Sequence, residues 1–328
     1  MNREGSRVLY VGDKDSLHHQ RFIRLLQSNF ETRTVFTESG TSIELRDFAP
    51  NLVICAPLQE PLRYALSTFS VPIIGISWAL ELNEPRKIYE TDSDFSLALS
   101  KLSGLIVDNH YHVDFLRRNL NLNIPIQVVT FNLEPLPKMP LNRTLDKSKK
   151  IIISARSFEP LYRNDLILES ISSFTEEESF VLMMAGGGSQ LEELKAIHSK
   201  QYMKNRLLFL GPVSNNRLLH LMSESHLYVS AAQSDGISVT LLEAMQFGLV
   251  CLVSDFPTNV EVISHGFNGF LFANGDSHSF KSELKSILNL DEDRLNSIST
   301  SAKRTVEERF SWHKSSSTFL HFISSFLV

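Results

Sequence analysis

The sequence predicts an α/β protein with two doubly wound, Rossmann-like domains. Short, continuous apolar runs recur along the chain, as expected of parallel strands that are buried on both faces. Segments of helical length separate these runs, which indicates repeated βα units. A proline-rich and basic segment at 134–150 divides the runs into two series. Together these observations favour two domains joined by a linker.

In the first series, the predicted strands occupy 7–12, 51–56, 71–77, 104–108 and 125–130. The stretch that follows the first strand has Phe22, Ile23, Leu25 and Leu26 at helical spacing, which predicts an amphipathic helix. In the second series, the predicted strands occupy 150–155, 180–186, 206–211, 227–231 and 249–255. Each series is long enough to form one open parallel sheet.

Three domain ranges follow from this pattern. We expect an N-terminal domain over 1–147 and a C-terminal domain over 148–310, joined near residue 145. The tail at 311–328 alternates hydroxyl and apolar residues at nearly helical spacing. We expect it to form a final helix that packs back toward the N-terminal domain. Ligands of such sheets bind beyond the carboxyl ends of the strands.

The composition narrows the class of protein and its surroundings. The chain has 328 residues, of which 42% are hydrophobic and 21% charged, as in soluble globular proteins. A net charge of −5 argues against nucleic acid as a partner. Cys55 and Cys251 lie in apolar runs, which favours buried thiols in a reducing compartment. We expect a cytoplasmic protein, since neither a signal peptide nor a membrane span is evident; peripheral contact with the inner face of a membrane is left open.

The stretch "SDGISVTLLEAM" at 234–245 contains two acidic residues that could serve in ligand binding or catalysis. Asp235 precedes Gly236 at the predicted start of a helix, and Glu243 lies inside that helix. The amides of 237–240 at the helix N-terminus form a ready site for an anion. Carboxylates on either side can accept hydrogen bonds from hydroxyl groups. This layout fits a sugar–diphosphate–nucleoside; a turn residue and a solvated helix acid are the alternative.

The same stretch resembles the E-x7-E motif of retaining glycosyltransferases of the GT-B fold, the group 1 or family 4 type. The resemblance is specific over 226–276 and continues upstream in 151–171 and in "VLMMAGGGSQLEELK". The N-terminal half matches in its alternation of strands and helices and in a few short segments such as 77–82. The resemblance implies two Rossmann-like domains that face each other across a cleft, with the acceptor on the N-terminal side and the donor on the C-terminal side.

The resemblance also implies roles for individual residues. Glu243 would bind the ribose hydroxyls, and Asp235 would hold hydroxyls of the donor sugar. Arg156 would neutralise the diphosphate that leaves, a role that suits a permanently charged, forked guanidinium. These three residues form the predicted catalytic set. The amides that would serve the phosphates and the sugar are those of Gly236, Ile237, Ser238 and Val239.

Some positions depart from the family pattern on the donor side. Asp235 is one methylene shorter than the usual glutamate. The family usually follows its arginine with a lysine–glycine pair, where this chain has Tyr162 and Arg163. Arg163 is therefore our candidate for a second positive charge at the donor. Gly187, in the glycine loop at 185–189, is a further donor-binding candidate, with a tight turn as the alternative.

The sequence signals for acceptor-binding residues and for a metal site are weaker than those for the donor site. Many family members carry a histidine near the donor sugar that we do not find here. The acceptor-side candidates are His18, His19, Trp78 and Glu81. Asp92-Ser93-Asp94 matches the D-x-D of metal-dependent transferases, but helix capping explains it better. His110 and His112 lack cysteine or acidic partners at the usual spacing, so no metal site is predicted.

The predicted activity is transfer of a sugar from a nucleotide-sugar, such as a UDP- or GDP-sugar, to an acceptor hydroxyl. The family implies retention at the anomeric carbon and no metal requirement. The predicted acceptor is a carbohydrate, a lipid-linked molecule or another hydroxyl compound, in polysaccharide or glycoconjugate biosynthesis. No cofactor is expected beyond the nucleotide-sugar co-substrate. A binding protein without turnover and a GT-B sugar-nucleotide epimerase are the alternatives.

Overall fold

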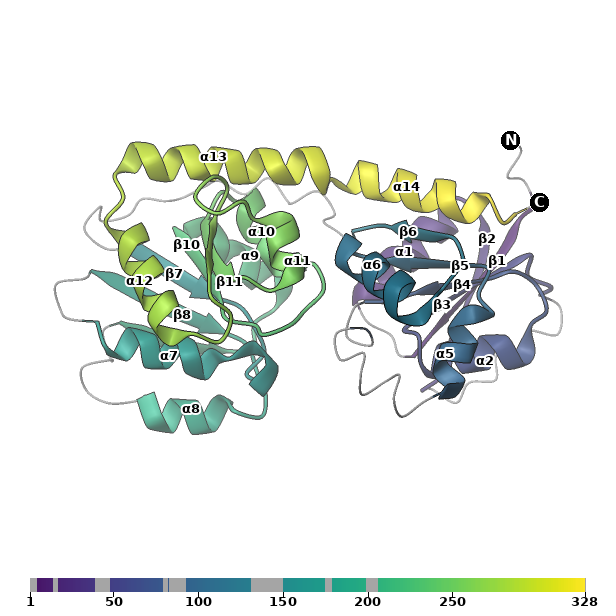
Figure 1. Cartoon of the computed structure of the whole chain (residues 1–328), viewed down its shortest axis with the longest axis horizontal. Coiled ribbons are helices and arrows are strands. Elements are labelled where there is room, and N and C mark those ends of the chain that lie inside the picture. Colours follow the sequence, from purple (N-terminus) through teal and green to yellow (C-terminus); the bar gives the residue numbers. More distant parts are fainter. Residues whose placement is uncertain are drawn as a thin grey trace. The chain divides into compact units, whose positions relative to one another are not determined.

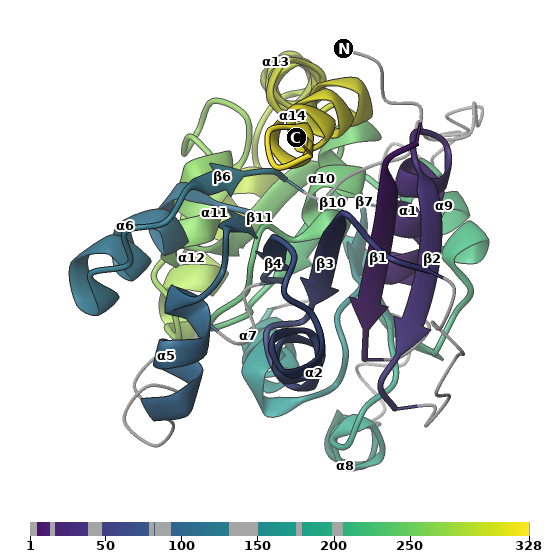
Figure 2. The same cartoon turned by 90° about the vertical axis from the view of Figure 1, so that its right-hand side faces the viewer.

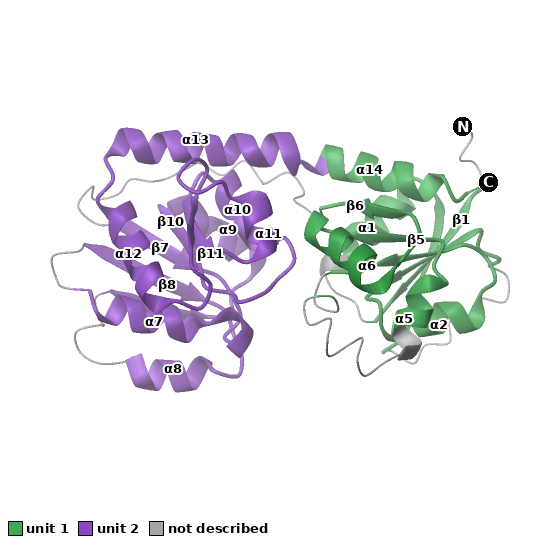
Figure 3. Cartoon of the chain, in the orientation of Figure 1, with its two compact units in different colours: residues 1–131, 313–328 green, residues 132–312 purple. Residues whose placement is uncertain are grey.

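The structure is a computed structural model that describes residues 5–13, 17–38, 48–78, 82, 93–130, 150–174, 179–198 and 206–327. The chain divides into two compact units (Figure 3). The N-terminal unit combines Met1–Phe131 with His313–Val328, and the C-terminal unit is Asn132–Trp312. The predicted linker lies outside the described residues except for Lys150.

The N-terminal unit contains one parallel sheet of six described strands in the order β2-β1-β3-β4-β5-β6 (Figures 1 and 2). Its described elements are β1 (Arg7–Gly12), α1 (Leu17–Gln27), β2 (Glu31–Phe36), β3 (Leu52–Ala56), α2 (Glu60–Thr68), β4 (Ile73–Ile76), α5 (Ser93–Ser100), β5 (Gly104–Val107), α6 (His110–Leu120), β6 (Ile126–Val128) and α14 (Trp312–Ser324). The strand order reverses at β1, so the topological switch point of this sheet lies between β1 and β3.

Helices cover both faces of this sheet. Residues of α1 and α14 pack on one face, where the rings of Phe22 and Phe319 lie 5.4 Å apart. Residues of α2, α5 and α6 pack on the other face, among them Leu62, Leu99 and Leu116. All of these side chains are nearly inaccessible to solvent. Full burial of one such side chain stabilises a fold by about 1.5–3 kcal/mol, so the helix faces fix the layers.

The C-terminal unit also contains one parallel sheet of six described strands, in the order β12-β11-β10-β7-β8-β9. Its described elements are β7 (Lys150–Ser154), η1 (Pro160–Tyr162), α7 (Asn164–Ser172), β8 (Phe180–Ala185), α8 (Leu191–His198), β9 (Leu207–Gly211), α9 (Asn215–Glu224), β10 (Leu227–Ser230), α10 (Val239–Gln246), β11 (Val250–Ser254), α11 (Pro257–Val262), β12 (Phe270–Phe272), α12 (Ser277–Leu288) and α13 (Glu292–Arg309). Here the switch point lies between β7 and β10.

Two hydrophobic clusters sandwich the second sheet. Side chains of α7, α8 and α12 pack on one face, and side chains of α9, α10, α11 and α13 pack on the other. Two parallel sheets with helices on both faces are the arrangement that the alternating pattern predicts. The predicted α/β fold with two Rossmann-like domains is therefore confirmed.

Two strands were not predicted, and both lie at the edge of a sheet. In β2, exposed or half-exposed positions such as Glu31 and Arg33 alternate with more buried ones, so no continuous apolar run marks the strand. β12 has only three residues and follows a turn. Along the described part of the chain, no helix combines the length and apolar character that a membrane crossing requires.

Candidate functional site

The candidate site lies beyond the carboxyl ends of β7 and β10. These strands are neighbours in the second sheet, and the strand order reverses between them. Arg156 comes two residues after the end of β7, and Asp235 lies in the loop between β10 and α10. In doubly wound sheets, ligands bind at this edge because the connections leave the two strands on opposite sides.

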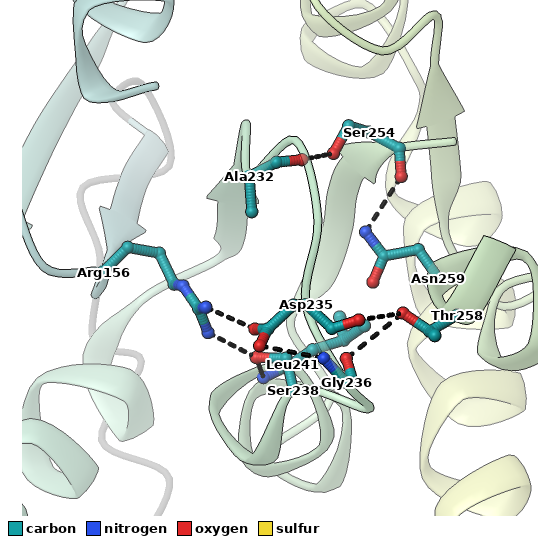
Figure 4. Close-up of polar contacts among 9 residues, drawn as sticks. All are labelled: Arg156, Ala232, Asp235, Gly236, Ser238, Leu241, Ser254, Thr258 and Asn259. Atoms are coloured by element: carbon teal, nitrogen blue, oxygen red, sulfur yellow. Dashed lines mark hydrogen bonds and ion pairs between the residues drawn. The ribbon is translucent and has the colours of Figure 1, made fainter. Parts of the chain in front are cut away.

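Arg156 and the loop before α10 are joined by direct hydrogen bonds (Figure 4). Arg156 Nη1 donates to Ser238 Oγ at 2.8 Å, and Nη2 donates to Asp235 Oδ2 in an ion pair. Asp235 Oδ1 also accepts from the amide of Gly236 at 3.0 Å. Ser238 is the N-cap of α10 and accepts from Leu241 N at 3.3 Å. The structure therefore brings three other predicted donor-site residues, Asp235, Gly236 and Ser238, together at the guanidinium of Arg156.

The Arg156–Asp235 pair is largely shielded from solvent. The side chains are 10% and 17% exposed, respectively. Burial has the largest single influence and lowers the pKa of the Arg156 guanidinium, but the negative charge and hydrogen bond of Asp235, together with Tyr228 and Tyr162, raise it, so the pKa lies above its ordinary value. Arg156 consequently stays positively charged. Its buried Nε has no hydrogen-bond partner among the described residues.

Tyr162 covers one face of this guanidinium. The Cζ of Arg156 lies 4.2 Å from the centre of the Tyr162 ring, within the range of a cation–π contact. Arg163, the next residue, has a φ of 47°, a left-handed conformation that favours glycine. A left-handed conformation at position 163 fits the glycine of the family's lysine–glycine pair. In that comparison Tyr162 corresponds to the lysine.

Arg163 makes its described contacts with a neighbouring acid. Its Nε donates to both carboxylate oxygens of Asp165, at 3.1 Å and 3.0 Å. The side chain of Arg163 is 27% exposed. The positive charge at this position is therefore partly balanced by Asp165, whereas Arg156 makes the described contacts with the loop at 235–238.

A second set of polar residues holds the loop before α10 in place. Thr258 Oγ1 donates to the carbonyl oxygens of Asp235 and Gly236, at 3.1 Å and 3.2 Å. Ser254 Oγ donates to the carbonyl of Ala232, and Asn259 Nδ2 donates to the carbonyl of Ser254 at 2.9 Å (Figure 4). These residues were not among the predicted site residues. Their signal in the sequence is the segment "SDFPTN", which begins at the last residue of a buried strand.

Glu243 and Ile237 extend the site along α10. Glu243 is only 5% exposed, so it is not a solvated helix acid. Ile237 is also buried, and α10 begins at Val239, close to the helix start that the sequence predicts. The helix N-terminus and a buried acid farther along the same helix therefore both occur in the structure.

The glycine loop after β8 packs against the segment that carries Arg156. The amide of Phe158 donates to the carbonyl of Gly187 at 2.8 Å. A Cβ at Gly188 would lie 2.6 Å from the carbonyl of Phe158, and its φ is 147°. Glycine is thus required here for the close approach of two loops of the protein itself. This contact supports the tight-turn interpretation and holds the loop that carries Arg156.

The N-terminal sheet has its own polar cluster at the carboxyl end of β1. His19 is fully buried; its Nδ1 lies 2.9 Å from Tyr10 Oη, and its Nε2 lies 2.8 Å from Asp13 Oδ1. Burial raises the pKa of Tyr10 well above its ordinary value, so its hydroxyl stays protonated and can donate to Nδ1. His19 Nε2–H then donates to Asp13. A Cβ on Gly12 would lie 2.9 Å from the His19 ring, so Gly12 makes room for it.

The other acceptor-side candidates differ in what the structure describes. The Trp78 ring lies 4.5 Å from the His19 ring, and Trp78 is half-buried. The side chain of His18 and all of Glu81 lie outside the described residues, as does Asp92. His112 is buried, and its Nδ1 lies 2.7 Å from Nδ2 of Asn109, the N-cap of α6. No group of three or more potential metal ligands occurs among the described residues.

Two relatives are similar to this chain in sequence. N-acetyl-alpha-D-glucosaminyl L-malate synthase of Bacillus anthracis is 28% identical over 166 residues, which cover 51% of this chain and 43% of that protein. An uncharacterized glycosyltransferase of Methanocaldococcus jannaschii is 24% identical over 237 residues, which cover 70% of this chain and 58% of that protein. The chain thus spans about half the length of these curated relatives.

Solved structures show the same fold. The structure of Anabaena HepE in complex with UDP and glucose matches with a TM-score of 0.77 at 14% identity, over 98% of this chain and all of that one. This likeness establishes the GT-B fold. Residues 139–304, just over half of the sequence, match the family described as "Glycosyl transferases group 1". The chain therefore belongs to the group 1 family of glycosyltransferases.

Proposed function

We propose that this protein transfers a sugar from a nucleotide-sugar to an acceptor hydroxyl, with retention at the anomeric carbon. The observation that carries the proposal is the meeting of Arg156 with the N-terminus of α10 at the switch point of the second sheet. A fixed cation and the amides of a helix N-terminus together suit a diphosphate. Such preorganised groups stabilise the charge that develops on a leaving group.

Each donor-site residue has a distinct role in this proposal. Arg156 binds the diphosphate oxygens and stabilises them as they leave the sugar. Asp235 accepts hydrogen bonds from hydroxyls of the donor sugar, and the buried Glu243 accepts them from the ribose. The amides of Gly236, Ile237, Ser238 and Val239 face the phosphates and the sugar. Gly187 and Arg163 lie on loops that flank this group and complete the donor side.

The acceptor is proposed to bind to the N-terminal unit, near Trp78 and the carboxyl end of β1. His19 acts there indirectly, because it is fully buried and orients the carboxylate of Asp13. The proposed donor is a UDP- or GDP-sugar, used without a metal or another cofactor. HepE was solved with UDP and glucose, which supports a UDP-sugar as the first donor to test. We place the reaction in polysaccharide or glycoconjugate assembly, with a carbohydrate or lipid-linked acceptor.

The experiment is binding of nucleotide-sugars to the full chain without added metal. We expect UDP-glucose or another member of a UDP- and GDP-sugar panel to raise the melting temperature, since a ligand at 100 times its Kd stabilises by about 2.7 kcal/mol. Glu243→Gln should weaken that ligand by about tenfold, the value of one charge-assisted hydrogen bond. Glu307→Gln, which removes the same charge at an exposed position of α13, is the matched control.

Product analysis then separates transfer from the alternatives. Transfer with retention predicts a product whose anomeric configuration, read from proton coupling in NMR spectra, equals that of the donor. Binding without consumption of any donor would indicate a binding protein, and interconversion of the donor sugar would indicate an epimerase. A panel in which neither wild type nor Glu243→Gln responds to any nucleotide would overturn the proposed donor site.

A further inference from the structure

In this structure the carboxylate of Asp235 occupies the place of an anion. One oxygen accepts from Arg156 Nη2, and the other accepts from the amide of Gly236 at 3.0 Å. The proposed function assigns the same cation and the same amide to the nucleotide. The pair is neutral as a whole, since Arg156 contributes one positive charge and Asp235 one negative charge. The site therefore carries its own internal anion.

Arg156 is held more firmly in this pair than Asp235. Its guanidinium also donates to Ser238 at 2.8 Å, lies against the ring of Tyr162 and is 10% exposed. The side chain of Asp235 is 17% exposed, and its described contacts are with Arg156 and its neighbour Gly236. The backbone carbonyl of Asp235 is fixed by Thr258. Rotation of the Asp235 side chain, with the backbone kept in place, is the simplest way to release Arg156.

We propose that Asp235 makes the site discriminate an intact nucleotide-sugar from the free nucleoside diphosphate. A diphosphate that binds Arg156 must displace the carboxylate, which then lies unpaired beside further negative charge. A nucleotide-sugar offsets this loss because its sugar hydroxyls donate to the displaced carboxylate. A free nucleoside diphosphate lacks these sugar hydroxyls, and its ribose hydroxyls bind to Glu243 instead. Asp235 therefore favours the donor over the product and helps to expel the product, an inference that rests on the proposed function.

The test compares matched ligands by titration calorimetry on the full chain. The probes are UDP with UDP-glucose, GDP with GDP-mannose, and ADP with ADP-glucose. The variant is Asp235→Asn, which removes the charge but keeps an oxygen that can accept from Gly236. Glu169→Gln, at an exposed position of α7, changes the net charge by the same amount and is the control. Melting temperatures without ligand show that each variant is folded.

Asp235→Asn should change the affinities for the two ligands of a pair differently. Wild type should bind the nucleotide-sugar at least about tenfold more tightly than the diphosphate, as expected for one charge-assisted hydrogen bond. Asp235→Asn should bind the diphosphate about tenfold more tightly than wild type and the nucleotide-sugar no more tightly, so that the preference disappears. Asp235→Ala should show the same gain for the diphosphate. Glu169→Gln should retain the wild-type preference.

The outcomes that contradict the inference differ from those that contradict the proposed function. If wild type binds a nucleotide-sugar and Asp235→Asn binds the matching diphosphate no better than wild type does, the discriminating role is wrong and the donor site stands. Equal weakening of both ligands in Asp235→Asn would likewise show that Asp235 only shapes the site. If wild type binds none of the six probes, the proposed donor site and this inference fail together.

Discussion

Both sheets place an aspartate next to a glycine near the switch point, but the two aspartates have different partners. Asp13 follows Gly12 at the end of β1 and pairs with His19, which is fully buried and contacts Tyr10. Asp235 precedes Gly236 after β10 and pairs with Arg156, which contacts the hydroxyl of Ser238. Each site is thus a hydrogen-bonded series of a carboxylate, a nitrogen-containing side chain and a hydroxyl.

The difference lies in the charge that each chain can carry. The chain from Tyr10 through His19 to Asp13 is satisfied with a neutral imidazole, because one ring nitrogen accepts and the other donates. Arg156 cannot become neutral, and it remains a partner for any anion that displaces Asp235. The same fold therefore supports a self-contained polar cluster at one sheet and an anion site at the other. Removal of the His19 ring and removal of the Arg156 guanidinium should therefore have different effects on stability and on ligand affinity.

The largest effect is expected from Arg156→Met. Loss of the guanidinium should weaken UDP-glucose binding by a factor of about 100, since truncation of one partner of a buried, hydrogen-bonded charge pair costs about 2–5 kcal/mol of binding free energy. The variant also leaves Asp235 unpaired. Because Asp235 is partly exposed, we expect a loss of about 1–3 kcal/mol in the free energy of unfolding, less than for a fully buried pair. Calorimetry and urea denaturation measure the two effects.

The double variant Arg156→Met/Asp235→Asn separates stability from binding. Removal of both charges should restore most of the unfolding free energy, because no unpaired carboxylate remains. Binding of UDP-glucose should stay weak, since the cation is still missing. Recovery of binding in the double variant would contradict the assignment of Arg156 to the diphosphate.

His19→Ala should have the opposite profile. It removes a fully buried ring and leaves the hydroxyl of Tyr10 without its acceptor, so the free energy of unfolding should fall by about 2–4 kcal/mol. Affinity for UDP-glucose should remain within about twofold of wild type. That change in binding free energy is well below the roughly 1.4 kcal/mol that corresponds to a tenfold change in Kd. Tyr10→Phe, which removes the hydroxyl alone, should cost about 1 kcal/mol. A loss of donor affinity without a loss of stability would break the contrast between the two sheets.

The sequence predicted every described strand except one edge strand of each sheet. A central parallel strand such as β3 is buried throughout, so it appears as a continuous apolar run. β2 is partly exposed and β12 is very short, so neither has that signal. The helix at 17–27 was recognisable because its buried residues recur with helical spacing.

The candidate site was predictable where its residues are close in sequence. Asp235, Gly236 and Ser238 lie in one loop, and the helix start after them is marked by its own pattern. The contact between Arg156 and this loop joins residues about 80 positions apart. The resemblance assigned Arg156 and this loop to one donor site, but it did not predict that they contact each other directly. The stacking of Tyr162 on Arg156 depends on the left-handed turn at Arg163, which spacing does not reveal.

The smallest effect is expected at Tyr162, whose ring lies against the guanidinium of Arg156. Tyr162→Leu removes the ring face and with it a cation–π contact of about 0.5–2 kcal/mol, so UDP-glucose should bind several-fold more weakly. Tyr162→Phe keeps the ring and should bind like wild type, whereas a role of the hydroxyl would make it behave like Tyr162→Leu.

Tyr162→Lys adds a second cation beside a site whose charge is balanced by Asp235. It should bind UDP more tightly than wild type does, most clearly at low salt, because the added attraction is screened as salt rises. Equal affinities in all four proteins would mean that Asp235 and Ser238 alone hold Arg156.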